Sequence, residues 1–142
     1  MRVAALLHDI GKNAVPAEIL TKPVQLNKIE FELVKEHARQ GYEILKEVYF
    51  PWPIAEIVRQ HHERLDGSGY PDKLTDDSVC LEARIIAVAD VVEAMSSHRP
   101  YRAALGIEEA LEEIRKNAGR LYDPTVVKAC LEVFKEGFEF SE

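Results

Sequence analysis

The sequence predicts an all-α protein, and three observations support this prediction. Apolar residues recur at intervals of three and four along most of the chain, as they do on one face of an α-helix. No segment alternates apolar and polar residues in the manner of a half-buried strand. Helix-starting pairs such as Asp123-Pro124 and helix-ending residues such as Gly119 lie at the ends of the periodic segments. We therefore expect a bundle of roughly five to seven helices.

Length and composition limit the classes of protein that are possible. The chain has 142 residues, 46% of them hydrophobic, which is enough for a single domain over residues 1–142 with its own core. No apolar run approaches the roughly 20 residues that span a bilayer, and Cys80 and Cys130 are expected to be reduced core thiols. We expect a cytoplasmic protein. The net charge of -7 argues against binding long nucleic acids, but allows a small phosphate ester if cations are concentrated locally.

The first predicted helix, residues 3–7, is apolar on every side, which suits a buried helix. It runs into the sequence HDIGK at residues 8–12, where Gly11 is expected to end it. His8 and Lys12 lie four residues apart, and therefore on one face if the helix persists. Because the chain begins inside an apolar helix, we expect a domain that lacks helices packed upstream.

A connector over residues 13–27 precedes a helix that is expected to run from Asn27 to about Val48. Asn27 and Glu30 have the spacing of a capping box, with asparagine in place of the usual serine or threonine. His37 lies on the apolar stripe of this helix and is therefore expected to face the core.

The next predicted helix begins at Pro53, and its apolar stripe continues into His61 and His62. Two glycines and a proline in residues 66–71 break the helical pattern and form a loop. One histidine on an apolar stripe is more often a satisfied core residue than a ligand, but two together favour a metal site. Glu63 has two interpretations, as a carboxylate that orients an imidazole or as a surface carboxylate.

The most hydrophobic predicted helix covers residues 81–97, with Asp90 in its middle. An unpaired buried carboxylate costs on the order of several kcal/mol, so Asp90 must be neutralised, paired with an internal arginine or bound to a metal. Glu93 shares the face of Asp90 and is a candidate for a supporting role. Two further helices are expected, one around residues 107–114 and one that opens at Asp123.

The candidate metal ligands are imidazoles and carboxylates from four helical segments. They are His8, Asp9, His37, His61, His62 and Asp90. Without a thiolate, such a set suits iron, manganese, cobalt, nickel or zinc rather than magnesium or calcium. Because these ligands are too many for one tetrahedral site, we expect two neighbouring metals that share a carboxylate. Such a pair can activate water and neutralise a phosphoryl group.

Five motifs follow one another in an order and spacing that cover nearly the whole chain. They are AALLHDIGK, KEHARQGYEIL, HHERLDGSGYP, RIIAVADVVEAM and HRPYR. A lone HD pair is a weak signal, whereas this combination is strong. With these motifs the chain resembles an HD-GYP domain, the branch of the HD-superfamily metal-dependent phosphohydrolases that hydrolyses the bacterial messenger cyclic di-GMP. The resemblance implies an HD-domain helical bundle.

The resemblance also implies roles for individual residues. The metal ligands would be His8, Asp9, His37, His61, His62 and Asp90, which would hold two, or three, divalent ions, iron or manganese, with Asp9 bridging. Asp9 and Lys12 would be the catalytic residues, with Lys12 contacting phosphate. Arg99 and Arg102 would bind the substrate beside Lys12, and Tyr70 would form the lip of the pocket.

The activity that the resemblance implies is hydrolysis of cyclic di-GMP to linear pGpG, GMP or both, by a metal-activated hydroxide. Two alternatives stay open. One is an HD-GYP module with impaired catalysis that contacts protein partners through the loop from Gly67 to Pro71. The other is a phosphohydrolase that acts on another nucleotide.

The family pattern has a further metal-binding histidine upstream of the HD pair, which this chain lacks. We therefore expect one under-liganded metal position and weak or lost activity. An apolar face would be exposed where the upstream helices pack, and would favour a homodimer or a swapped oligomer.

Overall fold

The structure is a computed structural model, and it describes residues 1–97 and 105–140. Within these ranges the regular structure is helical, and β-pairing is confined to isolated bridges, which confirms the all-α prediction. The α-helices are α1 (Arg2–Leu7), α2 (Ala17–Leu20), α3 (Lys28–Lys35), α4 (His37–Leu45), α5 (Ile54–Gln60), α6 (Leu81–Ser96), α7 (Ile107–Lys116) and α8 (Pro124–Lys135). Short 3-10 helices, η1 (Ile10–Ala14) and η2 (Asp76–Ser78), interrupt the loops.

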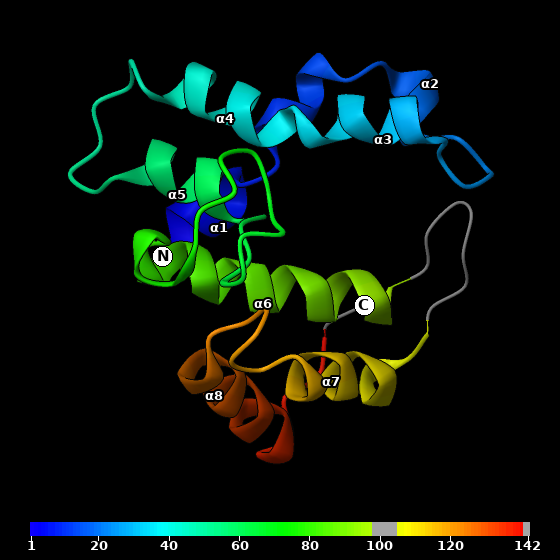
Figure 1. Cartoon of the computed structure of the whole chain (residues 1–142), viewed down its shortest axis with the longest axis vertical. Coiled ribbons are helices and arrows are strands. Elements are labelled where there is room, and N and C mark those ends of the chain that lie inside the picture. The colour runs from blue at the N-terminus through cyan, green and yellow to red at the C-terminus, as the bar shows by residue number, and fades with distance from the viewer. Residues whose placement is uncertain (98–104, 141–142) are drawn as a thin grey trace.

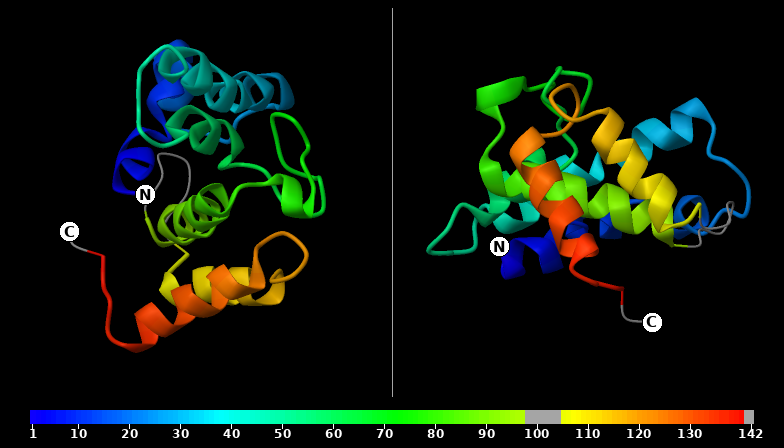
Figure 2. Two further views of the ribbon diagram at one scale, coloured as in Figure 1. Left: turned by 90° about the vertical axis from the view of Figure 1, so that its left-hand side faces the viewer. Right: turned by 90° about the horizontal axis from the view of Figure 1, so that it is seen from below.

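Helix α6 crosses the middle of the molecule, with α3 and α4 at one end and α7 and α8 at the other (Figure 1). The left view of Figure 2 shows the same order from the side. Ala83 and Ile86 of α6 belong to a buried apolar cluster with α1, α4 and α5. Val88 and Val92 belong to a second cluster with α7 and α8. Because α6 packs on both sides, it carries apolar residues on more than one face, which explains why it is the most hydrophobic helix of the sequence.

The helix ends follow the capping residues that the sequence shows. Asn27 and Glu30 form the expected capping box, with each side chain accepting a hydrogen bond from the other's backbone N–H. Asp123 caps α8 by accepting hydrogen bonds from the N–H groups of Thr125 and Val126. Both predicted helix starts are confirmed.

The prediction of one helix from Asn27 to Val48 is wrong, because the chain forms α3 and α4 with a break at Glu36. At the break the Glu36 N–H bonds the Leu33 carbonyl in a tight turn. The His37 Nδ1–H donates a hydrogen bond to the Val34 carbonyl at 2.6 Å. In an uninterrupted helix that oxygen would accept from the backbone N–H four residues later. The same histidine therefore ends α3 and begins α4.

None of the helices in the described ranges combines the length and apolarity that a bilayer crossing requires. Cys80 and Cys130 are free and half-buried.

Candidate metal centre

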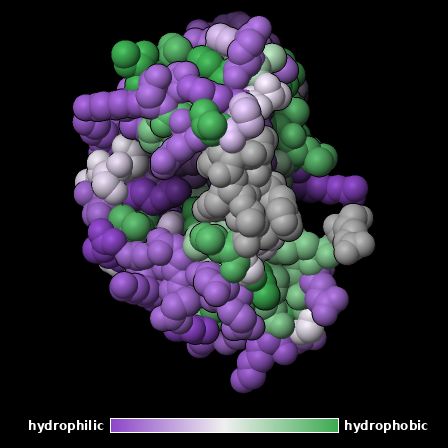
Figure 3. All heavy atoms as spheres, turned by 90° about the vertical axis from the view of Figure 1, so that its right-hand side faces the viewer, coloured by the Kyte–Doolittle hydropathy of each residue, from purple (hydrophilic) through white to green (hydrophobic). Residues whose placement is uncertain are grey.

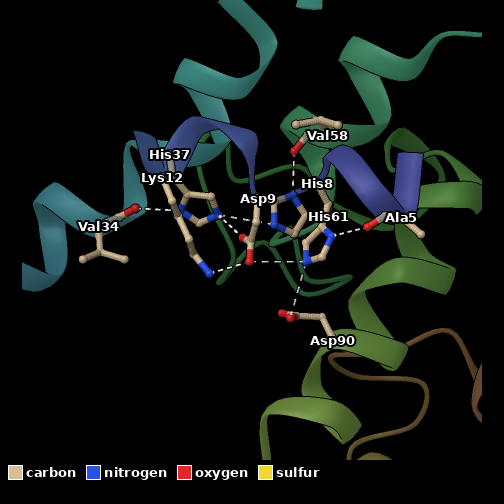
Figure 4. Close-up of polar contacts among 9 residues, drawn as sticks. All are labelled: Ala5, His8, Asp9, Lys12, Val34, His37, Val58, His61 and Asp90. Carbon is tan, nitrogen blue, oxygen red and sulfur yellow. Dashed lines mark hydrogen bonds and ion pairs between the residues drawn. The ribbon is translucent and has the colours of Figure 1, made fainter. Parts of the chain in front are cut away.

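Four side chains each offer one ligand atom within 4.8 Å of the others, and we call them the ligand group. They are Asp9, His37, His61 and His62. Asp9 lies between α1 and η1, His37 at the start of α4, and the two adjacent histidines just after α5. Helix packing therefore brings together residues that lie up to 53 positions apart in the chain. Figure 4 shows His8, His37 and His61 turned toward Asp9.

Three imidazoles are oriented by the main chain at helix ends. Each Nδ1 lies 2.6 Å from the carbonyl oxygen three residues earlier, in the pairs His8–Ala5, His37–Val34 and His61–Val58. A carbonyl can only accept a hydrogen bond, so each Nδ1 carries the proton. Each Nε2 therefore presents a lone pair, which is the form of histidine that binds a metal.

The Nε2 atoms of His37 and His61 face each other at 3.3 Å. Both side chains are buried, at 1% and 0% exposure, and burial lowers the pKa of each. Two neutral rings with Nδ1 protonated have no hydrogen to share between these nitrogens. Their facing lone pairs repel each other in the protein interior. A cation bound to both nitrogens would remove this repulsion, because each lone pair would then point at positive charge. The residues thus fit a metal ion.

The carboxylate of Asp9 faces two sides of the group. Its Oδ1 lies 3.5 Å from His37 Nε2, whereas its Oδ2 lies 3.5 Å from His8 Nε2. Lys12 Nζ donates to the same Oδ2 at 2.5 Å. A carboxylate with its two oxygens directed at different imidazoles has the geometry that a shared ligand needs.

Asp90 and His8 contact the ligand group from one side and lie outside it. The Oδ1 of Asp90, in α6, is 3.8 Å from His8 Nε2. The interaction with the Asp90 carboxylate raises the pKa of His8. Burial raises the pKa of Asp90, but His8, His61 and Lys12 together outweigh burial, and the pKa lies below its usual value. No arginine of the described ranges pairs with Asp90, so the arginine alternative is not what the structure shows there.

A hollow of about 330 Å³ opens beside His8, Asp9 and Asp90, and Glu93 also lines it. Glu93 accepts a hydrogen bond from the Ser97 hydroxyl at 2.7 Å.

Tyr70 lies against the histidines, at the edge of the group. Its ring stacks on His62 with the centroids 4.7 Å apart and the planes at 26°. Burial lowers the pKa of His62 and raises the pKa of Tyr70. The ammonium of Lys35 lies 5.6 Å from the centroid of the Tyr70 ring. Arg99 and Arg102, which the sequence predicts as substrate-binding, lie outside the described residues, as does His98.

Glu63 differs from both of its sequence-based interpretations. The side chain is 2% exposed, and therefore is not a surface carboxylate. Its oxygens accept hydrogen bonds from the backbone N–H groups of Asp72 and Leu74 rather than from an imidazole. Burial raises its pKa, against the lowering effect of these two bonds. Sequence reasoning also missed Lys35, for which periodicity and spacing offer no signal, since its position depends on how α3 meets the loop.

Comparison with known proteins shows which proteins resemble this chain. A family model described as HD domain matches residues 1–126. The cyclic di-GMP phosphodiesterase response regulator RpfG of Xanthomonas campestris pv. campestris is 47% identical over 92% of this chain and 35% of its own length. The 3'3'-cGAMP-specific phosphodiesterase 3 of Vibrio cholerae is 43% identical over 87% of this chain and 27% of its own length.

Among solved structures, Bd1817, an HDG"Y"P protein of Bdellovibrio bacteriovorus, matches with a TM-score of 0.73 and 19% identity. That match covers 94% of this chain and 42% of Bd1817, and it shows a shared fold. The chain thus spans about a third of the length of the curated relatives that it matches.

Proposed function

Because this chain belongs to the HD-domain family, we propose that it is the catalytic part of a metal-dependent phosphodiesterase that hydrolyses a cyclic dinucleotide. The resemblance to HD-GYP domains, first read from the motifs, is confirmed by the relatives and by the shared fold. The observation that carries the proposal is the pair of buried Nε2 lone pairs at 3.3 Å, beside an aspartate that faces two sides. A metal cation suits this arrangement, because each imidazole can donate its Nε2 lone pair to it.

The ligand group would hold one ion, and His8 and Asp90 would hold a second, with Asp9 as the ligand that the two sites share. Nitrogen and oxygen donors without thiolate suit iron, manganese, cobalt, nickel or zinc, and the family resemblance implies iron or manganese among these. Bound metal would supply Lewis-acid activation of water and neutralise charge on the phosphate.

The residues of the chain have separate tasks in this reaction. Hydrolysis adds a hydroxyl group to phosphorus and a proton to the leaving ribose oxygen. Lys12, already directed at Asp9, would stabilise charge on a non-bridging phosphate oxygen as a mobile point charge. Tyr70 would contact the substrate at the His62 side, and Arg99 and Arg102 would bind it from the segment after α6. The product would be linear pGpG, GMP or both.

Cyclic di-GMP is the substrate that the resemblance implies, and RpfG is named for it. A second candidate substrate is 3'3'-cGAMP, because a relative with 43% identity is named as specific for it. Both are cyclic dinucleotide messengers, which would place the activity in the cytoplasm. The loop 67–71 would be a contact for protein partners.

The test is an anaerobic assay of a version of the protein that carries the upstream helices, loaded with Fe²⁺ or Mn²⁺, with both dinucleotides as substrates and chromatography of the products. We expect His61→Ala to lose metal and to reduce turnover by at least about 100-fold, since even a residue that only orients a ligand contributes about 10- to 100-fold. Glu56→Gln, an exposed carboxylate change on α5, is the matched control and should turn over normally.

If the version with the upstream helices holds metal and turns over neither dinucleotide, the proposal is contradicted. That outcome would favour the HD-GYP interaction module, and turnover of another nucleotide alone would favour the wider superfamily.

A further inference from the structure

The loop that follows His62 folds back directly onto the segment that carries the histidines. The Tyr70 N–H donates to the His62 carbonyl at 3.2 Å. A Cβ on Gly69 would lie 2.4 Å from the Arg64 nitrogen and 2.5 Å from Glu63 Cα, so only glycine permits this approach. The backbone on both sides of the Tyr70 ring is therefore set by contact with residues 62–64.

Glu63 holds the far side of this loop from within the protein. Oε1 accepts from the Asp72 N–H at 2.7 Å and Oε2 accepts from the Leu74 N–H at 2.9 Å. The carboxylate is 2% exposed, so water cannot readily replace either bond. One buried side chain thus satisfies two backbone donors of a loop that has no helix or strand to satisfy them.

Arg59, four residues earlier, attaches the same loop residue on the surface. Its Nε and Nη2 donate to the two carboxylate oxygens of Asp72 at 2.6 and 2.8 Å. Its guanidinium also lies over the Tyr42 ring, 4.9 Å from the centroid, which fixes the arginine against α4. Asp72 is therefore held at its backbone by Glu63 and at its side chain by Arg59.

We propose that Glu63 is a positioning residue for the substrate site: by binding the N–H groups of Asp72 and Leu74, it keeps the Tyr70 ring stacked on His62. The proposal rests on the proposed function in one respect, namely that Tyr70 contacts the substrate. His61 keeps its own hydrogen bond to the Val58 carbonyl, so loss of Glu63 should loosen the loop without releasing that ligand. Substrate binding should weaken, while the chemical step is retained.

The test compares Glu63→Gln with Glu56→Gln, the same substitution at an exposed position of α5, seven residues earlier in the chain. Glutamine is isosteric but has only one oxygen, so its NH₂ group faces one of the two loop donors. With 3-fluorotyrosine at position 70, we expect Glu63→Gln to shift and broaden the ¹⁹F signal. KM for the cyclic dinucleotide should rise about tenfold, which corresponds to loss of about one such bond. We expect kcat to stay within about twofold and bound metal to be unchanged, and Glu56→Gln to match the wild type in every readout.

An unchanged ¹⁹F signal in Glu63→Gln, or a moved signal with unchanged KM, would overturn the proposal. If the wild type turns over no dinucleotide, the proposed function fails and the ¹⁹F signal alone decides whether Glu63 positions Tyr70. If Glu63→Gln does not fold, Arg59→Lys on the surface tests the same attachment. It replaces a two-point contact with Asp72 by a point charge, and should move the Tyr70 signal in the same direction.

Discussion

The imidazoles of His8, His37 and His61 owe their orientation to the main chain, because each ring donates Nδ1–H to a carbonyl three residues earlier. Sequence periodicity was sufficient to select these residues, since each lies on or beside an apolar face. It could not predict which ring nitrogen would be free, because that depends on where each helix ends. The Tyr70 stack on His62 was also beyond it, because the stack requires the loop to reverse direction.

Metal should stabilise the folded chain as well as activate it. At free Mn²⁺ about 100 times its Kd, linkage adds about 2.7 kcal/mol to the free energy of unfolding. Thermal unfolding followed by circular dichroism should therefore show a higher Tm with metal than after chelation. His61→Ala is the control, and its Tm should respond little to the metal. Equal responses of the two proteins would show that the ion binds elsewhere.

Gly69→Ala should destabilise the protein by about 1–3 kcal/mol, because the added methyl group meets backbone atoms that cannot move away cheaply. Gly119→Ala is an informative comparison. Its Cβ would meet nothing within 4 Å, and only its left-handed φ of 78° resists the change, at a cost of about 1 kcal/mol. Denaturant unfolding of both variants measures the difference. If Gly69→Ala loses less stability than Gly119→Ala, the loop can shift away from residues 62–64.

At the scale of the elements, capping residues predicted helix starts well and helix interiors poorly. Asn27, Glu30 and Asp123 act through contacts within a few residues, so the sequence contains the whole interaction. The break between α3 and α4 lies at His37, whose Nδ1 bonds the Val34 carbonyl of α3 while the residue joins the other members of the ligand group. Local apolar periodicity does not carry that information, since it continues through the break.

The Arg59–Asp72 pair between α5 and its loop should make stability depend on pH below neutrality. Arg59 holds the pKa of Asp72 below its usual value, so the pair stabilises the protein above the unfolded pKa of about 3.9. That stabilisation is lost as the pH falls through the lowered folded pKa. Asp72→Asn should cost up to about 1 kcal/mol at pH 7 and almost nothing near pH 2.

Urea unfolding of the wild type and Asp72→Asn across this range measures the difference. Asp77→Asn, at an exposed carboxylate of η2 that is 3.9 Å from Arg84, provides a control. A pH-independent difference for Asp72→Asn would show that the ion pair with Arg59 does not account for the loss of stability.

At the scale of the whole molecule, the sequence predicted helix class and the identity of the candidate ligands, but not which helices meet. The sequence predicted α6 as the most hydrophobic helix, and only the structure shows that it separates two cores. The net charge led to the prediction that a phosphate ester can bind only where cations are concentrated locally. Figure 3 shows hydrophilic side chains over much of one face of the molecule, and the net charge is -7, while Lys12 lies at the ligand group.

An apolar groove of about 530 Å³ between α6 and α8 should support self-association at high concentration. Leu81, Val133, Phe138 and Phe140 line it and are 44–56% exposed. Sedimentation equilibrium should show a mean mass that falls on dilution, and Val133→Asp should remain monomeric. Glu132→Gln, on the neighbouring position of α8, is the control and should associate as the wild type does. A monomer at every concentration would contradict the prediction.

The shared helix α6 makes the two apolar clusters of the molecule depend on each other for stability. All six candidate ligands precede residue 91, so a fragment ending after α6 would retain every one of them. Such a fragment would nevertheless expose Val88 and Val92, which flank Asp90, to water. A fragment that ends at Ser96 would therefore keep the complete donor set and still be a poor metal-binding protein, because the residues that support the ligand group extend beyond it.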